Sequence, residues 1–488
     1  MSTPNYHQLL LDIIHYVYHV EISSHLAYKR ARIVLLDSMG CAIKTLSQSL
    51  EARAFVGPVV PGTTVPNGFR LPGTAFALDP VKGAFDLGLL IRYVDHNDAY
   101  SDREWGHPGD NLGSIVAVAD WLSRSRAAGD ACGKPTTLKE VLTAHIKAYE
   151  IQLHQWYLEM LGSLANGDLD DAIPVKIAST AVVAHLLGLS EEQALSALSH
   201  AWLDRHLHFA FQQPPNAGPR RGWATGDACS STVHLCFLAK AGQPGPPWAI
   251  MTPKRGFEDI ASSNEGFTIP KHFEAFAIEN DFRLIAAKER STSASEAAVE
   301  LVIRLEVMGR AVSDIEKMTI RTHHNAKSIL DKTGPLRNPK ERFHCIQYLV
   351  AVSLMKGFFI DSDDYADRSP WASDPRVDAL RDKMVIVEDE QFTKDYHDPE
   401  VDSKANAIQV KMKTGEDISE IVVEFPIGHR KHSKTLDFIQ KKFRVNMNKG
   451  GFESARVDVI TGLVQTNGLA IHHFVDLFAK EVGYVGNP

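Results

Sequence analysis

The sequence has few cysteines, and none of them are closely spaced. Five cysteines are spread over 488 residues, and no C-x-x-C motif occurs. A structural zinc site or a disulfide framework needs paired or closely placed thiols, and a cubane iron–sulfur cluster needs clustered thiolates. The scattered cysteines therefore argue against all three and indicate a protein of a reducing compartment.

Long apolar runs and long basic runs are also missing. No stretch of about 18 uncharged apolar residues occurs, so we expect no transmembrane helix. Lys plus Arg number 52 and Asp plus Glu number 60, a net charge of −8, whereas nucleic-acid binding needs a basic surface. The first 20 residues lack the features of a signal peptide or transit peptide. We expect a soluble, cytoplasmic protein that binds neither membranes nor nucleic acid, with the mitochondrion as the alternative location.

What remains is the composition of an ordinary globular protein, 44% hydrophobic and 23% charged. Apolar residues recur at helical spacing over residues 25–47, 80–94, 112–127 and 138–162. Strand patterns begin after about residue 276, and segments 407–413 and 418–425 flank a Thr-Gly-Glu-Asp turn, which is a hairpin signal. The sequence predicts a mainly α protein with an α+β insertion. Its expected parts are a large helical domain (1–275), a smaller α+β domain (276–428) and C-terminal helices (429–488) that return to the first domain.

The densest polar cluster, residues 95–111, follows one of the apolar helical segments. It contains several carboxylates and two histidines, and Gly106 and Pro108 favour a turn around His107. A histidine held rigidly among carboxylates suits general acid/base catalysis, because its neighbours can tune its pKa. The alternative interpretation is a capped, solvated loop between two helices.

A second cluster places Arg220 and Arg221 on a Pro- and Gly-rich segment before an apolar helix. The arginine guanidinium binds carboxylates in a bidentate manner, and a helix N-terminus favours an anion. The alternative is an ordinary surface loop. A metal site built from His107, His323, His344 and carboxylates is a further alternative, but no metal-ligand spacing supports it, and we expect neither a metal nor a cofactor.

Several long segments resemble the MmgE/PrpD family of 2-methylcitrate dehydratases. The resemblance covers about residues 8–445. The segments that carry it are residues 57–68, Asp95-x-Asn97-Asp98, 104–111, 215–228, 334–336, 344–348 and 395–399.

This resemblance implies a helical domain with a smaller α+β lid domain, a homodimer, and a small-molecule tricarboxylate substrate. The implied reaction is metal-independent elimination of water from a 2-alkyl tricarboxylate to give an alkyl cis-aconitate. By the matched motifs, the resemblance implies catalytic roles for Asp95, His107 and Tyr348, and substrate binding by Asp110, Asn111, Arg220, Arg221 and His344. Asp110 and Asn111 would also position the acid/base pair, and Tyr348 would reach the substrate from the lid.

The chain departs from the family pattern at three positions. Asp171 stands where the family commonly has a histidine, Arg283 replaces a lysine, and Arg290 or Ser291 replaces a second histidine. We expect Asp171 to act in catalysis and Arg283 in substrate binding. The departures favour a divergent, secondary-metabolic member acting on a longer 2-alkylcitrate. Three apolar residues would then face the alkyl tail, or alternatively pack in the helical core: Leu207, Phe209 and Phe211.

Two other functions stay open from the sequence alone. A cis-aconitate-type decarboxylase would use a similar tricarboxylate site and release carbon dioxide instead of water. A catalytically impaired paralogue would bind a tricarboxylate without turnover, because the substituted histidines and lysine could leave anion binding intact.

Overall fold

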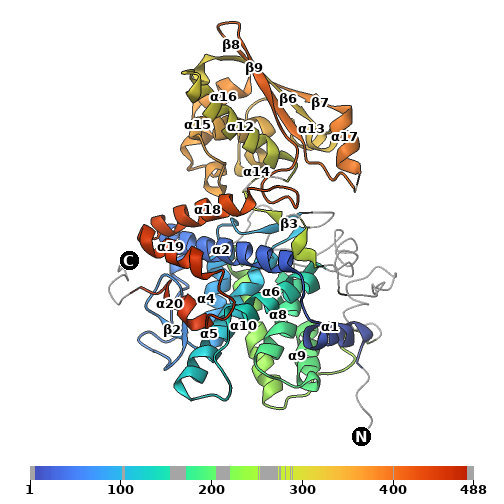
Figure 1. Ribbon diagram of the computed structural model, residues 1–488, viewed down its shortest axis with the longest axis vertical. Coiled ribbons are helices and arrows are strands. Elements are labelled where there is room, and N and C mark those ends of the chain that lie inside the picture. The colour runs from blue at the N-terminus through green and yellow to red at the C-terminus, as the bar shows by residue number, and fades with distance from the viewer. Residues whose placement is uncertain are drawn as a thin grey trace. The chain divides into compact units, whose positions relative to one another are not determined.

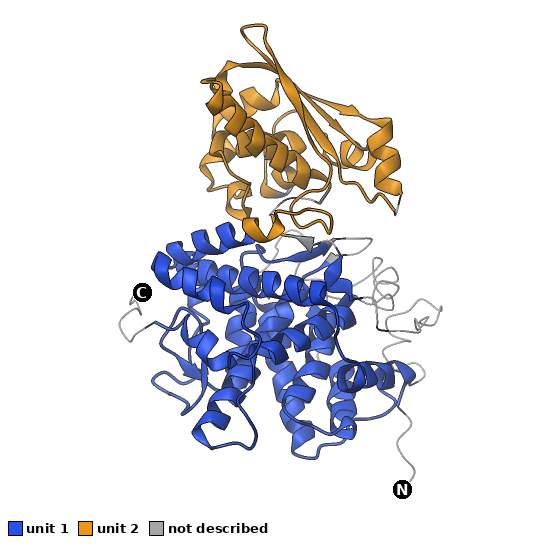
Figure 2. Cartoon of the chain, viewed as in Figure 1, with its two compact units in different colours: residues 1–281, 439–488 blue, residues 282–438 orange. Residues whose placement is uncertain are grey.

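The computed structural model describes residues 6–101, 105–153, 172–204, 220–250, 252, 273, 276–280, 282–285, 287, 289–398 and 400–480. The chain divides into two compact units (Figure 2). Unit 1 comprises Met1–Asp281 and Ile439–Pro488, and unit 2 comprises Phe282–Phe438. The sequence analysis places the corresponding boundaries at 275 and 428, so the second division lies ten residues later. It falls inside helix α18 (Thr435–Lys449), because the first turn of that helix belongs with unit 2.

Unit 1 consists almost entirely of helices in its described part. Its helices are α1 (Gln8–His19), α2 (His25–Gln48), α3 (Leu50–Arg53), α4 (Pro80–Arg92), the 3-10 helix η1 (Pro108–Asn111), α5 (Leu112–Ala128), α6 (Leu138–Leu153), α8 (Ala172–Leu186), α9 (Glu191–Leu203), α10 (Arg220–Lys240), η3 (Ala277–Glu279), most of α18, α19 (Ser454–Leu463) and α20 (Ile471–Asp476). Two short antiparallel pairs join them: β1 (Phe69–Arg70) with β2 (Ala77–Leu78), and β3 (Ala99–Ser101) with β4 (Trp105–Gly106).

Helix α4 lies against both α5 and α10 at the centre of unit 1 (Figure 1). Glycines permit this close approach. A Cβ atom on Gly113 of α5 would lie 2.7 Å from the Cα atom of Gly88 in α4, and one on Gly226 of α10 would lie 2.6 Å from the carbonyl oxygen of Phe85. The end of α4, the start of α5 and the first turns of α10 are therefore held together by direct backbone packing.

Local sequence signals explain where these helices begin and end. The Asp79 side chain accepts hydrogen bonds from two backbone N–H groups at the start of α4, and Pro80 occupies the first helical position. Ser190 and Gln193 form the capping box that their spacing predicts before α9. Gly129 ends α5 in the left-handed conformation, with φ +85°. Capping thus sets the helix ends close to those expected from the sequence.

Unit 2 contains a four-stranded mixed sheet in the order β7-β6-β8-β9. The strands of this sheet are β6 (Ile315–Thr322), β7 (Met384–Glu388), β8 (Asn406–Met412) and β9 (Asp417–Val423). The short strand β5 (Phe282–Arg283) is not part of it. Strands β6 and β7 are parallel, and the other two pairs are antiparallel. The β8–β9 pair is the hairpin that the sequence predicts, and Gly415 occupies its turn with φ +84°.

The helices of unit 2 are α12 (Glu289–Val307), η4 (Val312–Asp314), α13 (His324–Leu330), α14 (Pro339–Phe343), α15 (Ile346–Lys356), η5 (Ser362–Tyr365), η6 (Pro370–Ser373), α16 (Pro375–Arg381) and α17 (Glu390–His397). Helix α12 packs on β8, β9 and α15. The mainly α fold with an α+β insertion is confirmed.

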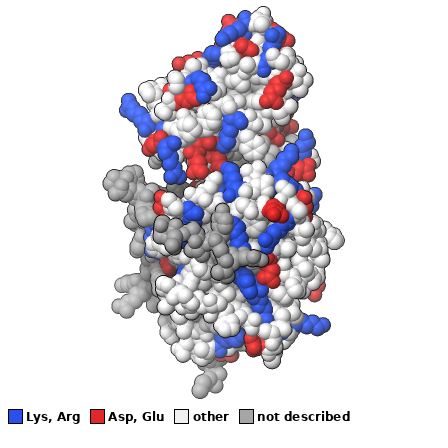
Figure 3. Space-filling model, turned by 90° about the vertical axis from the view of Figure 1, so that its left-hand side faces the viewer, with Lys and Arg blue, Asp and Glu red and all other residues white. Residues whose placement is uncertain are grey.

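Surface features agree with the composition. On the face seen in Figure 3, basic and acidic side chains are interspersed among uncharged ones. None of the helices in the described ranges combines the length and apolar character needed to cross a membrane.

Candidate active site

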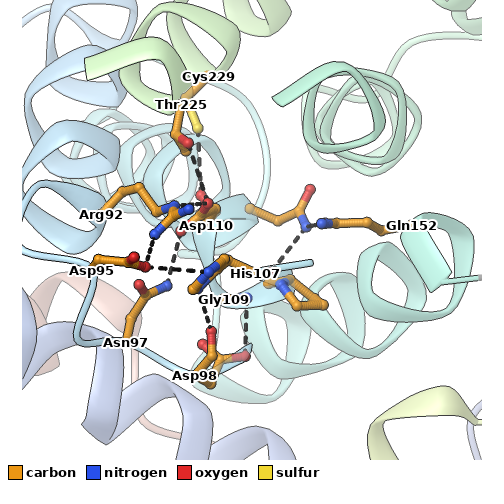
Figure 4. Close-up of polar contacts among 12 residues, drawn as sticks. Arg92, Asp95, Asn97, Asp98, His107, Gly109, Asp110, Gln152, Thr225 and Cys229 are labelled. Atoms are coloured by element: carbon orange, nitrogen blue, oxygen red, sulfur yellow. Dashed lines mark hydrogen bonds and ion pairs between the residues drawn. The ribbon is translucent and has the colours of Figure 1, made fainter. Parts of the chain in front are cut away.

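The connection between α4 and α5, residues 93–111, carries the polar cluster that the sequence singles out. Pairing of β3 with β4 sets Tyr100 opposite Gly106. This hairpin returns the chain, so that His107 lies beside the segment that contains Asp95 and Asp98 (Figure 4). The cluster is therefore assembled by a local turn and two flanking helices.

Asp95 adopts an unusual backbone conformation, with φ +52°. The left-handed region costs free energy for a residue with a Cβ atom and needs compensation from surrounding contacts. Its carboxylate forms an ion pair with Arg92 at the end of α4. Its Oδ1 atom also lies 3.4 Å from Nε2 of His107. The Asp95 side chain is 36% exposed and that of His107 is 0% exposed, so the carboxylate is the outer member of the pair.

The His107 ring is oriented by a backbone contact. Nδ1 lies 2.8 Å from the carbonyl oxygen of Asp98. Because a carbonyl oxygen only accepts, Nδ1 must carry the hydrogen, and in the neutral ring the lone pair is then on Nε2, the atom that faces Asp95. The two side chains can therefore hold and transfer a proton between them.

Asp110 is buried next to this pair and is held by contacts with three side chains. Its Oδ1 accepts a hydrogen bond from Nδ2 of Asn97 at 2.9 Å. Its Oδ2 lies 3.5 Å from Nε of Arg92 and accepts from Oγ1 of Thr225, on α10, at 3.2 Å. Arg92 therefore bridges Asp95 and Asp110, and it compensates the charge of both carboxylates.

Asn111 connects η1 to two further helices. Its Nδ2 donates to the carbonyl oxygen of Pro108 at 2.9 Å and to Oε1 of Gln152, on α6, at 2.6 Å. Its Oδ1 accepts from Oγ of Ser179, on α8, at 2.7 Å. These contacts suit a positioning role, and direct substrate binding by Asn111 and Asp110 stays a prediction.

The comparisons with known proteins cover both units. Residues 11–270 match the MmgE/PrpD N-terminal domain, and residues 286–465 match the MmgE/PrpD C-terminal domain. The chain belongs to the MmgE/PrpD family. This confirms the resemblance drawn from the motifs.

Curated relatives align with nearly the whole chain. The alkylcitrate dehydratase phiI of Fungal sp. (strain ATCC 74256) is 43% identical over 100% of this chain and 96% of its own length. The 2-methylcitrate dehydratase-like protein oryR of Aspergillus oryzae is 44% identical over 98% of this chain and 97% of its own. The 2-methylcitrate dehydratase of Escherichia coli is 44% identical over 91% of each chain.

Sequence reasoning assigns no role to several residues that hold this cluster, namely Arg92, Asn97, Asp98, Gln152, Ser179 and Thr225. The sequence does contain a signal for Arg92: it stands three residues before Asp95 at a helix end, and this spacing brings opposite charges together. Asn97 lies inside a matched motif but was given no role. Gln152 and Thr225 lie on other helices, and no local pattern indicates them.

The predicted arginines are described only in part. Arg220 begins α10, where its guanidinium lies 4.4 Å from the ring centroid of Trp223 and 3.3 Å from Oδ2 of Asp227. Thr225 follows five residues later on the same helix, so Arg220 is about 7.5 Å from it along the axis. The side chains of Arg221 and Arg283 lie outside the described part of the structure, and their roles stay predictions.

Asp171 and the apolar segment with Leu207, Phe209 and Phe211 also lie outside the described residues. Their expected roles therefore stay predictions as well.

Besides Arg283, unit 2 contains two predicted site residues, His344 and Tyr348, and both lie near the start of α15. Tyr348 is buried, and its hydroxyl donates to the carbonyl oxygen of Asp364 at 2.8 Å. Burial raises the pKa of this phenol well above its usual value, so it stays protonated and anchors α15 within unit 2. His344 is half-buried and its ring packs edge-on against Phe343. A catalytic or binding role for either residue stays a prediction.

Metal binding has no visible basis in this part of the MmgE/PrpD fold. Among the residues that the structure describes, no three His, Cys, Asp or Glu side chains are grouped so as to hold a metal ion.

Proposed function

We propose that this protein is a hydro-lyase that removes water from a 2-alkylcitrate, either 2-methylcitrate or a longer homologue, to give the 2-alkyl-cis-aconitate. The observation that carries the proposal is the contact between the Asp95 carboxylate and the buried, oriented imidazole of His107. Full-length similarity to relatives named 2-methylcitrate dehydratase and alkylcitrate dehydratase supports it.

Elimination of water requires a base and an acid. One C–H bond and one C–O bond break, a C=C bond forms, and the proton and hydroxyl leave as water. The proton lies next to a carboxylate and is weakly acidic, so the base needs favourable electrostatics around it. The exposed Asp95 carboxylate can take the proton from the substrate, and the Nε2 lone pair of neutral His107, 3.4 Å away, can receive it, with the carboxylate then stabilising the imidazolium.

The same pair can supply the acid. Once a proton is shared between Asp95 and His107, its transfer to the departing hydroxyl regenerates the starting state. Asp95 is the exposed member and is therefore the one we place against the substrate. Arg92 keeps the Asp95 carboxylate in place and is itself compensated by Asp110.

The three substrate carboxylates need cationic partners. We assign this role to Arg220, Arg221 and Arg283. Arg92 is buried between two carboxylates, whereas Arg220 is partly exposed and forms an ion pair with Asp227. We further propose a homodimer, as the family resemblance implies. We place the protein in the cytoplasm, with the mitochondrion as the alternative, since a relative in Yarrowia lipolytica is named a mitochondrial 2-methylcitrate dehydratase.

The deciding experiment is mass-resolved turnover of the purified protein with citrate, 2-methylcitrate, longer 2-alkylcitrates and cis-aconitate. We expect loss of one water molecule, with a preferred alkyl length. Release of carbon dioxide from cis-aconitate would instead identify a decarboxylase. Binding of a tricarboxylate without turnover at any pH would identify an impaired, ligand-binding paralogue.

A further inference from the structure

Asp98 contacts the His107 turn through both its backbone and its side chain. Its carbonyl oxygen accepts the Nδ1 hydrogen of His107 at 2.8 Å, and its Oδ2 accepts from the backbone N–H of Gly109 at 3.3 Å (Figure 4). One residue therefore holds the ring itself and the backbone two residues beyond it. Asp98 has no assigned role in the sequence-based site.

The Asp98 carboxyl group occupies the space where a side chain of residue 109 would lie. A Cβ atom on Gly109 would be 1.9 Å from Oδ1 of Asp98 and 2.8 Å from Oγ of Ser38. Only glycine fits this position without displacing the carboxyl group. Asp98 and the His107 turn are thus packed so closely that neither can move alone.

A buried ion pair supports the same segment from the other side. Nζ of Lys442, on α18, lies 2.6 Å from Oδ1 of Asp37, on α2, and donates to the carbonyl oxygen of His96 at 2.7 Å. Both side chains of the pair are buried. The hydroxyl of Tyr149, on α6, lies 3.5 Å from Oδ2 of Asp98. Three helices therefore fix residues 96–98.

The charge on Asp98 is sensitive to pH near neutrality. Burial, and then the nearby charge of Asp37, raise the pKa of Asp98 to about 7, although the Gly109 N–H, Lys442 and Tyr149 oppose the shift. Burial also raises the pKa of Asp37, against the effect of Lys442. Both carboxyl groups thus lie near Lys442, and the pKa of Asp98 is raised into the range in which its charge changes near pH 7.

We propose that Asp98 is a positioning residue for the elimination reaction: its carbonyl oxygen selects the tautomer of His107, and its carboxyl group holds the His107–Gly109 turn so that Nε2 faces Asp95. The effect of Asp98 on the reaction rate rests on the proposed function. Its effect on the tautomer of His107 does not, and it can be tested without turnover.

The kinetic test compares Asp98→Ala with Asp98→Asn. The amide oxygen of asparagine can still accept from Gly109, whereas alanine leaves that N–H buried and unpaired. We expect kcat to fall about tenfold to a hundredfold in Asp98→Ala with little change in KM, the scale typical of groups that orient a reacting residue. Asp98→Asn should recover most of that loss. It should also lack the inflection of kcat near pH 7 that the wild type owes to Asp98. Asp458→Asn, an exposed position, is the matched control.

The geometric test uses ¹⁵N chemical shifts of histidine-labelled protein, with the His107 signal assigned by its absence from His107→Gln. We expect the hydrogen on Nδ1 in the wild type. Asp98→Ala keeps the backbone carbonyl but removes the side-chain contact with Gly109 that holds the turn, so the His107 ring should no longer be fixed against that carbonyl and a mixed tautomer should appear. Thermal melting and circular dichroism confirm that the variant is folded. A kcat of Asp98→Ala equal to that of wild type, or an unchanged His107 tautomer, would overturn the inference. If the wild type turns over no alkylcitrate, the proposed function fails while the tautomer test still decides this point.

Discussion

The β8–β9 hairpin of unit 2 and the α4–α5 connection of unit 1 each contain a residue with a positive φ angle, but the two residues are stabilised in different ways. In the hairpin the positive φ angle belongs to Gly415, and the space beside it is open. In the α4–α5 connection the positive φ angle belongs to Asp95, and charged side chains lie buried around it. Local conformational preference explains the first turn, whereas the second keeps strain and buried charge that only its surroundings stabilise.

This difference shows where the protein keeps conformations and buried charges that cost folding free energy. Burying a charge is unfavourable unless it is paired, and Asp98, Asp110 and Arg92 are all nearly inaccessible to solvent. The turn of the hairpin carries an exposed ion pair, between Arg310 and Glu416. The α4–α5 connection combines a strained aspartate with buried charges, a combination that supports its proposed role as the active site.

The largest expected effect is on the reaction itself. His107→Gln keeps a polar side chain but removes the group that takes up a proton, so kcat/KM should fall about 10²- to 10⁴-fold. Steady-state kinetics with the preferred 2-alkylcitrate measures this. Gln391→His, an exposed position on α17, adds a histidine elsewhere and should leave the rate unchanged. A His107→Gln enzyme with wild-type kcat/KM would remove His107 from the mechanism.

The next largest effect concerns stability: removing a cation should destabilise the protein more in the α4–α5 connection than beside the β8–β9 hairpin. Arg92→Met leaves Asp110 buried without its cation, which should cost about 3–5 kcal/mol of unfolding free energy. Arg310→Met breaks the exposed pair beside the hairpin and should cost about 0–1 kcal/mol. Urea unfolding of both variants gives the comparison. Equal losses would mean that the α4–α5 connection is no more dependent on its charges than the hairpin.

Replacing a glycine with alanine should also have different consequences in the two regions. Gly109→Ala puts a methyl group against the Asp98 carboxyl group, which must displace it, so we expect about 1–3 kcal/mol of destabilisation together with loss of activity. Gly415→Ala strains only a left-handed turn in open space, and about 1 kcal/mol is expected with activity retained. Melting temperatures and kcat of both variants test this, and full activity in Gly109→Ala would contradict it.

The smallest expected effect is a pH dependence. The pKa of Asp98 is raised on folding, from 3.8 to about 7. The folded state therefore binds the proton more tightly, and the stabilisation is fully present below about pH 4 and is lost as the pH rises through 7. Because the charges of Asp37 and Lys442 act on the Asp98 carboxyl group and moderate the effect, we expect the wild type to lose about 1–2 kcal/mol relative to Asp98→Asn between pH 5 and pH 8. Urea unfolding at both pH values measures this, and a parallel change in the two proteins would refute it.

Much of the fold follows from short-range sequence signals. The capping box at Ser190, the proline at position 80 and the turn at Gly415 each act within a few residues, and the apolar period sets the helix faces. The motifs also place Asp95 and His107 in one short connection, and they identify the family. These features are local, so the sequence alone determined them.

Only the tertiary structure decided how the site is held. Asp110 meets Thr225, Asn111 meets Ser179, and Asp37 meets Lys442, pairs that are far apart in the chain. Hydrogen bonds and ion pairs of this kind depend on which helix faces pack together, and neither spacing nor propensity encodes that choice. The same packing buries Asp98 and thereby raises its pKa. The charge state of a carboxyl group is set by its surroundings in space and not by its neighbours in the sequence, so the sequence does not show it.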